Sequence, residues 1–263
     1  MDTKITYIKD KNIEYITFDE LDKYEELVCA FTTNKSSFRI VNDEDINLIN
    51  GKYELLMQDL EASSYVVPKQ THSNNVYVLQ DERGIYPENL VNVDAVVTNK
   101  KGVMLSLVFA DCTPIMLYDK KKKVVACVHS GWRGTLNSIV TETIKKMESE
   151  FNCNLYDIIC LIGPTIRKCH FEVDEDVKTL FYEKYNYLPN INEIIKKGEI
   201  KDDMQKYLID TVTLNKTIMK NLGILEENII DCNICTVCKC DTFHSHRKFK
   251  DKAGRSTLVV MLK

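Results

Sequence analysis

The sequence predicts an α+β protein with mixed β-sheets flanked by helices. Short runs rich in β-branched and aromatic residues occur along the chain, and three longer stretches carry apolar residues at helical spacing. The chain shows no internal repeat, no low-complexity linker and no clear boundary. We therefore expect residues 1–263 to form a single domain of packed sheets and helices.

The β-rich runs define the expected strands. The first two, at residues 5–8 and 13–18, are separated by the sequence Lys-Asp-Lys-Asn, which is typical of a hairpin turn. Further strands are expected at residues 28–33, 65–67, 76–79, 94–98, 103–109, 115–118, 124–129, 158–162, 228–234 and 257–262.

Four segments are expected to be helical. Residues 135–151 carry apolar side chains at positions 136, 139, 140, 144, 147 and 151, which lie along one face of a helix. The segments 173–185 and 207–222 are also amphipathic, and 52–61 is a short helix. The polar stretch 185–204 is predicted to be an irregular surface excursion.

The bulk composition excludes several classes of protein. The net charge is −4, so no global basic field attracts nucleic acid or an anionic membrane. No apolar run approaches the ~20 residues of a membrane span, and the first residues lack the apolar core of a signal peptide. We expect a cytoplasmic monomer with reduced cysteines. Cys29, Cys127 and Cys160 lie in apolar strand-like runs and are expected to be small buried hydrophobes.

The strands at 115–118 and 124–129 are predicted to form a hairpin that brings a thiol to an imidazole. If its turn is centred on Lys121-Lys122, then His129 faces Pro114 and position 131 faces Cys112. Because side chains alternate along a strand, His129 and Cys112 share a face as diagonal neighbours, roughly 7–8 Å apart at Cα. A slip of one residue would separate them.

A thiol beside an imidazole has three interpretations. Cys112 and His129 can be a nucleophile and its base, two ligands of a metal site, or an ordinary packing contact. The segment 130–134 is predicted to be a tight turn opening a helix, where backbone N–H groups can receive an anion. Arg133 lies in that turn, and His72 lies in a loop between two strands. On sequence alone, either could equally be a solvated side chain.

At these residues the chain resembles a known family, the bacterial laccase-domain proteins, also called the multicopper polyphenol oxidase or YfiH-like family. The matching stretches are QTHSNNV (70–76), DAVV (94–97) with ADCTP (110–114), HSGWRG (129–134), GPTI…FEV (163–173) and FHSHRKFKDKAGR (243–255). They run in family order over most of the chain. The departures are Ser130 for Ala, Phe171 for Tyr, His246 for Tyr and Lys248 for Arg.

The resemblance implies a YfiH-like fold and a metal site. The family's His, Cys and His ligands correspond to His72, Cys112 and His129. Two imidazoles and one thiolate suit Zn²⁺, and three protein ligands leave a fourth position open for water or substrate. Copper is the less suitable metal.

The resemblance also implies two reactions on purine nucleosides. In phosphorolysis, phosphate attacks the ribose C1′ of adenosine, inosine or methylthioadenosine, and a free base and ribose 1-phosphate result. Arg133, Arg247 and Arg255 are the expected phosphate contacts, because guanidinium matches a phosphate fork. In adenosine deamination, a water activated by zinc attacks C6 of adenine.

Deamination also requires a proton shuttle. Asp111 is adjacent to the ligand Cys112, although strand neighbours point to opposite faces, and Glu172 in the Glu-Val block is the alternative. Asp111 could instead simply hydrogen-bond the backbone. Ser245 and Arg247 are expected in a wall of the substrate pocket.

Three other functions stay open at this point. Cys112 and His129 could serve a metal-free cysteine hydrolase or deamidase, since the fold is said to resemble that of deamidase toxins. A copper phenol oxidase would need roughly ten histidine ligands, and the chain has five histidines. A non-enzymatic role in a larger complex is the third.

The densest run of metal-ligating residues lies elsewhere, in DCNICTVCKCDTFHSHR (231–247). Its four cysteines follow the spacing C-x2-C-x2-C-x-C, which lacks the second half of a zinc ribbon. We expect these thiols to be incidental reduced cysteines rather than a second zinc site or a redox pair. On that interpretation, Cys238→Ser and Cys240→Ser leave the zinc content unchanged.

Overall fold

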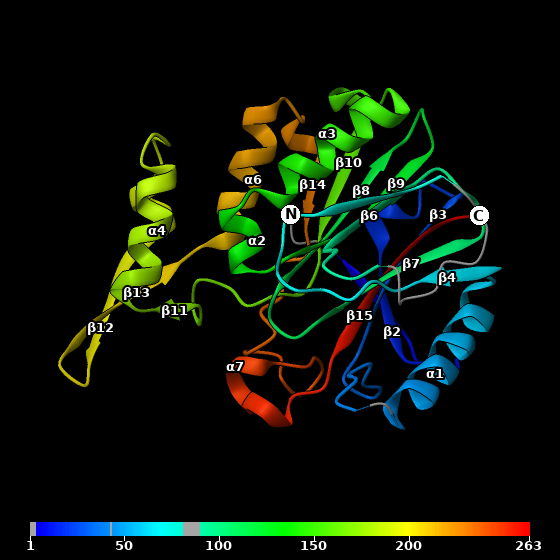
Figure 1. Cartoon of the computed structure of the whole chain (residues 1–263), viewed down its shortest axis with the longest axis horizontal. Helices are drawn as coiled ribbons and strands as arrows, with labels where there is room; N and C mark the ends of the chain where they lie inside the picture. Colours follow the sequence, from blue (N-terminus) through cyan, green and yellow to red (C-terminus); the bar gives the residue numbers. More distant parts are fainter. Residues whose placement is uncertain (1–3, 43, 81–89) are drawn as a thin grey trace.

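Two six-stranded sheets lie face to face in the computed structural model, which describes residues 4–42, 44–80 and 90–263 (Figure 1). The first sheet has the order β1-β2-β3-β15-β7-β4. Its strands are β1 (Ile5–Ile8), β2 (Tyr15–Phe18), β3 (Leu27–Thr32), β4 (Ser64–Val66), β7 (Val103–Phe109) and β15 (Ser256–Leu262). The second sheet has the order β14-β10-β8-β9-β6-β5. Its strands are β5 (Val76–Leu79), β6 (Ala95–Thr98), β8 (Thr113–Asp119), β9 (Val124–Ser130), β10 (Ile158–Ile162) and β14 (Ile229–Asp231).

Helices cover the two outer faces of this pair of sheets. Helix α1 (Glu44–Leu60) packs on the first sheet, and α3 (Ile139–Phe151) and α6 (Thr211–Leu222) pack on the second. The short helices are α2 (Trp132–Leu136) and α7 (His246–Phe249), and single 3-10 turns occupy Asp19–Leu21, Leu155–Asp157, Glu226–Asn228 and Lys250–Lys252. The result is a layered α+β fold with both parallel and antiparallel strand pairs, which confirms the predicted class.

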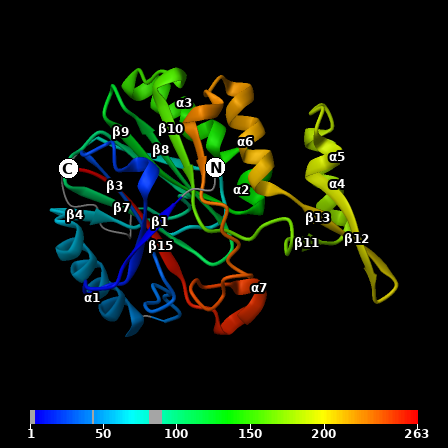
Figure 2. The same cartoon turned by 180° about the vertical axis from the view of Figure 1, so that it is seen from behind.

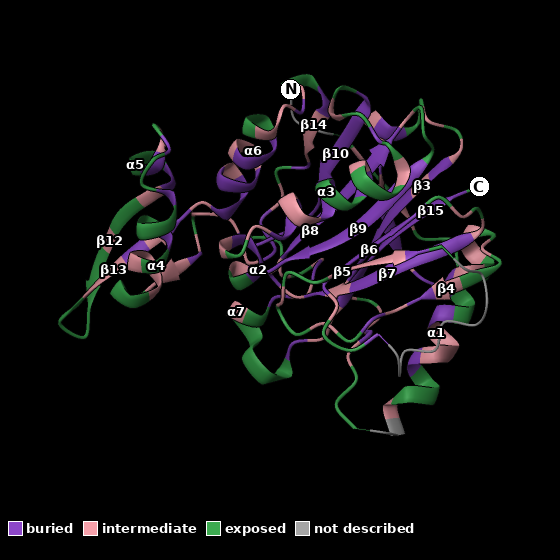
Figure 3. Ribbon diagram, turned by 45° about the horizontal axis from the view of Figure 1, so that its top comes forward, coloured by how far each residue is buried: buried purple, intermediate pink, exposed green. Residues whose placement is uncertain are grey.

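The central strands are buried on both faces, as Figure 3 shows by their colour. In β8, Met116 and Tyr118 point toward the first sheet, while Ile115 and Leu117 point toward α3 and α6. This two-sided burial explains why these strands read in the sequence as continuous apolar runs rather than as alternating patterns.

A third sheet extends from the side of the molecule (Figure 2). Strands β11 (Glu172–Val173), β13 (Met204–Ile209) and β12 (Ile195–Lys201) form it, together with α4 (Glu175–Tyr185) and α5 (Ile191–Ile194). The prediction of an irregular excursion at 185–204 was therefore wrong, as was that of helix at 207–209. The arm hairpin is mostly exposed on both faces, so it carries none of the apolar periodicity that marks a strand.

The predicted hairpin register is confirmed. Pro114 pairs with His129 and Thr113 with Ser130, and the antiparallel pairing continues to the Asp119–Val124 pair at the turn. One predicted helix was wrong in its extent: residues 135–151 are divided by Ser138, which takes a left-handed backbone with φ of 59°. The helix predicted at 52–61 begins earlier, at Glu44. That residues 1–263 form one domain stays a prediction.

No helix within the described ranges is both long and apolar enough to cross a membrane.

We expect Leu107→Ala to lower the free energy of unfolding by about 2–5 kcal/mol, because Leu107 is fully buried between the two sheets and its loss leaves a cavity. Urea unfolding followed by circular dichroism measures this. Leu48→Ala is the matched control: Leu48 is 62% exposed, so a change within about 0.5 kcal/mol is expected. Equal effects of the two substitutions would contradict the layered core.

Candidate metal centre

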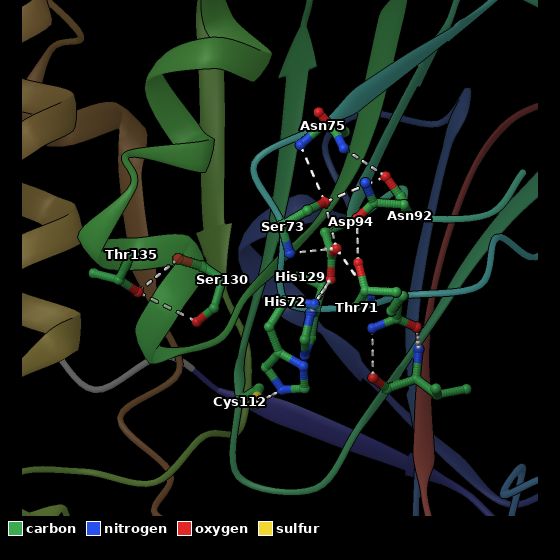
Figure 4. Close-up of polar contacts among 12 residues, drawn as sticks. Thr71, His72, Ser73, Asn75, Asn92, Asp94, Cys112, His129, Ser130 and Thr135 are labelled. Carbon is green, nitrogen blue, oxygen red and sulfur yellow. Dashed lines mark hydrogen bonds and ion pairs between the residues drawn. The ribbon is translucent and has the colours of Figure 1, made fainter.

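Three chain segments bring a histidine–cysteine–histidine triad to one end of the space between the two sheets (Figure 4). Cys112 lies in the connection through which the chain passes from β7 in the first sheet to β8 in the second. His72 lies in a second such connection, from β4 to β5, and His129 is in β9. The ligand atoms of the three side chains all lie within 4.8 Å of one another.

The side chains of the triad face one another. Cys112 Sγ lies 3.7 Å from His72 Nε2, and the two imidazole rings meet edge to face with centroids 4.9 Å apart. His129 is buried, and Cys112 is half-buried at the pocket surface. Two imidazole nitrogens and one thiol sulfur converging in this way form a set that can hold a soft or borderline divalent metal ion.

The buried carboxylate of Asp94 holds both histidines in place. Its Oδ1 accepts a hydrogen bond from His129 Nδ1 at 2.8 Å and another from the backbone N–H of His72 at 3.0 Å. Its Oδ2 accepts from the N–H groups of Thr71 and Ser73 and from the Ser73 hydroxyl. Because Nδ1 of His129 donates to a carboxylate, Nε2 is the nitrogen left to bind a metal.

The charges of the three groups reinforce one another. Burial raises the pKa of the Cys112 thiol, but the two neighbouring imidazoles outweigh burial and bring this pKa down to about 6. Burial lowers the pKa of His129, while the Cys112 thiolate and the Asp94 carboxylate raise it, to about 9. Burial also opposes ionisation of Asp94, yet hydrogen bonds from His129 and Ser73 hold its pKa at about 2. The thiolate needed by a metal is therefore available at neutral pH.

Gly131 closes the triad from one side. A Cβ atom at this position would lie 2.7 Å from His72 Cδ2 and 3.2 Å from Cys112 Sγ. These separations are too short for a carbon atom, so only glycine fits between β9 and α2 at this point. The Gly in the His-Ser-Gly-Trp-Arg-Gly segment thus follows from the space that the triad needs.

Gln70 fixes the loop that carries His72. Its side-chain amide donates to the carbonyl of Val108 at 3.0 Å and accepts from the N–H of the same residue at 2.7 Å. The loop is in this way fastened to β7, and His72 itself adopts a left-handed backbone with φ of 63°. The Gln and the His of the Gln-x-His segment therefore have separate tasks, one structural and one at the site.

The triad opens into a pocket of about 590 Å³. Arg247 and Arg255 lie in its wall together with Asp111 and His246, and Trp132 and Phe171 supply aromatic surface. The remaining lining residues are Gln70, Val108, Ala110, Thr113, Ser130, Ile166, Val173, Val177 and Thr211.

Asp111 holds two loops of the pocket together. Its Oδ1 accepts from the Thr236 hydroxyl at 2.6 Å, and its Oδ2 accepts from the backbone N–H of Arg247 at 2.5 Å. Its backbone is left-handed, with φ of 80°, which turns the side chain away from that of Cys112. The carboxylate therefore has a clear structural task, the one that the sequence left open beside that of proton shuttle.

The two arginines of the pocket are anchored through backbone carbonyls. Arg247 donates to the carbonyls of His170 at 2.8 Å and Glu172 at 3.0 Å. Arg255 donates to the carbonyls of Ala253 and Gly254. Carbonyl contacts position each guanidinium without cancelling its charge, so both remain available to an anion.

Three other residues predicted to contact substrate lie outside the pocket lining. Arg133 is exposed and stacks on Trp132, with its guanidinium carbon 4.1 Å from the ring centroid. The Glu172 carboxylate pairs with Lys201 at 2.8 Å, and the fully buried Ser245 caps α7 by accepting from Lys248 N–H. A direct role for these side chains stays a prediction.

Sequence reasoning missed Asp94 as a site residue. It lies directly before β6, and its only signal was an acidic side chain at the start of a fully apolar strand, within the DAVV segment. An acid at that position is buried unless it lies beyond the sheet, and a buried acid requires donors. Those donors are three backbone N–H groups, which a sequence pattern does not reveal.

The fold and the triad together define an α+β protein with a metal-ligating His-Cys-His site at the rim of two packed sheets. The profile of the family described as multi-copper polyphenol oxidoreductase laccase matches residues 33–263, and the chain belongs to this family.

Relatives of known name cover nearly the whole chain. A purine nucleoside phosphorylase of Bacteroides thetaiotaomicron is 30% identical over 275 residues, which cover 98% of this chain and 99% of that protein. Purine nucleoside phosphorylase YlmD of Bacillus subtilis is 31% identical over 256 residues, covering 91% and 90%. Adenosine deaminase RL5, from an unknown prokaryotic organism, is 29% identical over 222 residues, covering 82% of each chain.

A solved structure shares the fold. The crystal structure of YlmD from Geobacillus stearothermophilus superimposes with a TM-score of 0.84 at 20% identity, covering 99% of this chain and 100% of that one. The arrangement of the layers is therefore that of the YfiH and YlmD proteins.

We expect Gly131→Ala to lower the metal content of the triad, because the added methyl group pushes His72 away from Cys112. Elemental analysis of purified protein measures this. Gly51→Ala in α1 is the matched control, since a Cβ there meets nothing within 4 Å. A Gly131→Ala protein that keeps the full metal content would show that the triad tolerates the displacement.

Asp94→Asn should weaken metal binding at the triad by about 10–100-fold, because the amide cannot accept from His129 and from all the backbone donors at once. Competition with a chromophoric chelator gives the affinity. Asp10→Asn, at an exposed position, serves as the control. An unchanged affinity in Asp94→Asn would exclude this carboxylate as the positioning group.

Proposed function

We propose that the protein is a zinc-dependent purine nucleoside phosphorylase that also deaminates adenosine. The observation that carries the proposal is the placement of the metal-ligating triad and two anchored arginines in one pocket. The names of the relatives, purine nucleoside phosphorylase and adenosine deaminase, support both activities. The proposed nucleosides are adenosine, inosine and methylthioadenosine.

The donor set of the triad fits zinc. His72, Cys112 and His129 offer two nitrogens and one sulfur, and catalytic zinc sites hold three protein ligands and keep one position open. When bound there, zinc supplies Lewis acidity on the side of the triad that faces the pocket. The task of Asp94 and Gly131 is to keep the three ligands in place.

Arg247 and Arg255 are suited to bind phosphate. In phosphorolysis a phosphate oxygen forms a bond to C1′ while the bond from C1′ to the base breaks, and its electron pair leaves with the base. Two fixed guanidinium groups hold the attacking anion and stabilise the charge that develops. Both side chains are oriented by carbonyl oxygens before any ligand binds, so little reorganisation is needed.

The pocket has room and surface for a nucleoside. Its volume of about 590 Å³ lies within the ~300–1,000 Å³ typical of small-molecule sites. Phe171 and Trp132 offer apolar faces against which a planar base can pack. Arg247 lies over the Phe171 ring, with its guanidinium carbon 5.8 Å from the centroid, so the aromatic and cationic parts of the wall adjoin.

The proton donor for the departing base is a further part of the proposal. Asp111 lines the pocket, but its carboxylate joins Thr236 to Arg247, and Glu172 pairs with Lys201. His246 lies in the pocket wall and carries a titratable ring. We assign Asp111 a positioning role and His246 the proton transfer.

A metal-free cysteine hydrolase is the second candidate, because the lowered pKa of Cys112 beside a His129 held by Asp94 resembles an activated nucleophile with its base. His72 distinguishes the two. A hydrolase needs one imidazole at the thiol, whereas a metal site accounts for the second, 3.7 Å from Cys112. The five histidines of the chain are too few for a multicopper oxidase, which needs roughly ten at copper.

Incubation of adenosine or inosine with phosphate should release free base and ribose 1-phosphate, followed by chromatography. We expect Arg255→Ala to raise the KM for phosphate by about 10–100-fold, because one charge-assisted contact is lost. Lys248→Ala, at an exposed neighbouring position, is the control and should keep the wild-type KM. Base release that does not depend on phosphate would exclude phosphorolysis.

Removal of the metal separates the two candidates. We expect a chelator to abolish base release and added zinc to restore it, while Cys112→Ala stays inactive under both conditions. The measurement is activity against zinc content determined on the same sample. Full activity in a protein freed of metal would favour the cysteine hydrolase instead.

A further inference from the structure

A second cluster of metal-ligating side chains lies outside the triad. Cys169 and His170, in the connection from β10 to β11, meet Cys235 and Cys238, in the connection from β14 to α7. The ligand atoms of these four residues all lie within 4.8 Å of one another. The proposed activity uses none of them.

The distances within the cluster match the edges of a tetrahedron around zinc. Zn–S bonds of ~2.3 Å and Zn–N bonds of ~2.0–2.1 Å place two sulfurs about 3.8 Å apart, and a sulfur and a nitrogen about 3.6 Å apart. Cys169 Sγ lies 3.7 Å from Cys235 Sγ and 3.9 Å from Cys238 Sγ. His170 Nδ1 lies 3.6 Å from the sulfurs of Cys235 and Cys238 and 3.1 Å from that of Cys169.

The backbone around Cys235 is arranged to receive a thiolate. Burial raises the pKa of the Cys235 thiol, but the backbone N–H groups of Cys238, Arg167 and Val237 donate to it and bring the net pKa below the ordinary value. Two of these donors come from the Cys235-x2-Cys238 turn itself, which Lys239 closes by donating its N–H to the Cys235 carbonyl at 2.9 Å. Turns of this spacing form half of many zinc sites.

The two connections are held together independently of any metal. Thr165 N–H donates to the Ile234 carbonyl at 3.2 Å, and Thr236 N–H donates to the Thr165 carbonyl at 3.0 Å. Below this short bridge, the Arg167 guanidinium forms a two-pronged ion pair with Asp231. The two halves of the cluster are therefore brought together by the fold, so a metal would meet ligands already in place.

We propose that Cys169, His170, Cys235 and Cys238 bind a second, structural zinc ion. Four protein ligands fill a tetrahedral shell and leave no position for substrate, which is the pattern of structural rather than catalytic zinc. A disulfide would use two of the thiols and leave the third and the imidazole unexplained. Three thiolates and one imidazole also suit zinc better than calcium, magnesium or manganese.

The second zinc site stabilises the wall of the pocket. The connection that holds Cys169 and His170 also carries Ile166 and Phe171, and the connection that holds Cys235 and Cys238 leads to Arg247, all three lining the pocket. Arg247 donates to the carbonyl of the ligand His170 at 2.8 Å. A metal that joins these two connections thus fixes one of the two cations of the pocket.

The other cysteines of the 231–247 run have different surroundings. Cys232 is buried in the core between the two sheets, and burial raises the pKa of its thiol to about 12. Cys240 is half-buried and lies outside the cluster. The expectation that Cys240→Ser leaves the zinc content unchanged is retained, whereas for Cys238→Ser the proposal replaces it.

Zinc content of the full chain tests the proposal. Protein expressed with zinc should retain about two equivalents per chain, and Cys169→Ser or Cys238→Ser should retain about one. Cys240→Ser is the matched control and should retain both. Cys112→Ala should also lose one equivalent, so the double variant Cys112→Ala/Cys238→Ser should contain none.

Two further measurements keep the test independent of folding and of the proposed activity. Stepwise thiol modification of native wild-type protein should release zinc to a chromophoric chelator in two phases, and Cys112→Ala should show one. Cobalt substitution of Cys112→Ala should give the visible bands of a tetrahedral cobalt–thiolate site. Two equivalents retained in Cys238→Ser, or a disulfide among these cysteines found by thiol titration, would overturn the proposal, whatever the outcome of the nucleoside assay.

Discussion

The buried carboxylate of Asp94 is the contact on which the site depends. It lies at the end of β6 in the second sheet, yet it accepts three backbone N–H groups from the loop that arrives from the first sheet and one from the ring of His129. A carboxylate without water requires several donors to remain charged, and these donors are the elements that must be aligned. Charge compensation and the placement of the ligands are thus one and the same requirement.

Around that contact, tightly packed strands leave little freedom. His129 and Cys112 share the inner face of the second sheet because the hairpin register allows no other arrangement, and Gly131 leaves the space that the two imidazoles and the thiol fill. The residues of the pocket wall, by contrast, come from connections. Asp111 and the carbonyls that receive Arg247 hold those connections to the sheets. The rigid part of the site carries the metal ligands, and the part built from loops carries the contacts to an anion.

The sequence predicted what depends on local pattern and failed where distant segments decide. The hairpin register, the buried strands and the pairing of Cys112 with His129 followed from alternation and turn placement, and the resemblance added His72. The arm at residues 195–209 was missed because exposed strands lack apolar periodicity. The partners of Cys235 and Cys238 were missed because they lie 66 and 68 positions earlier in the chain, as His170 shows for Cys238, and no spacing rule links the two. The carboxylate of Asp94 needed donors that only the folded backbone supplies.

The position of β15 has a consequence for how the protein is made. This strand, at residues 256–262, lies between β3 and β7 in the middle of the first sheet, although β3 and β7 come far earlier in the chain. During synthesis the earlier strands therefore wait with an open gap, and Arg255, directly before β15, arrives with the strand that closes it. A ribosome must release this stretch before the sheet can complete, so the pocket assembles after translation of nearly the whole sequence. Until then, the apolar edges of β3 and β7 are exposed to other nascent chains and to chaperones.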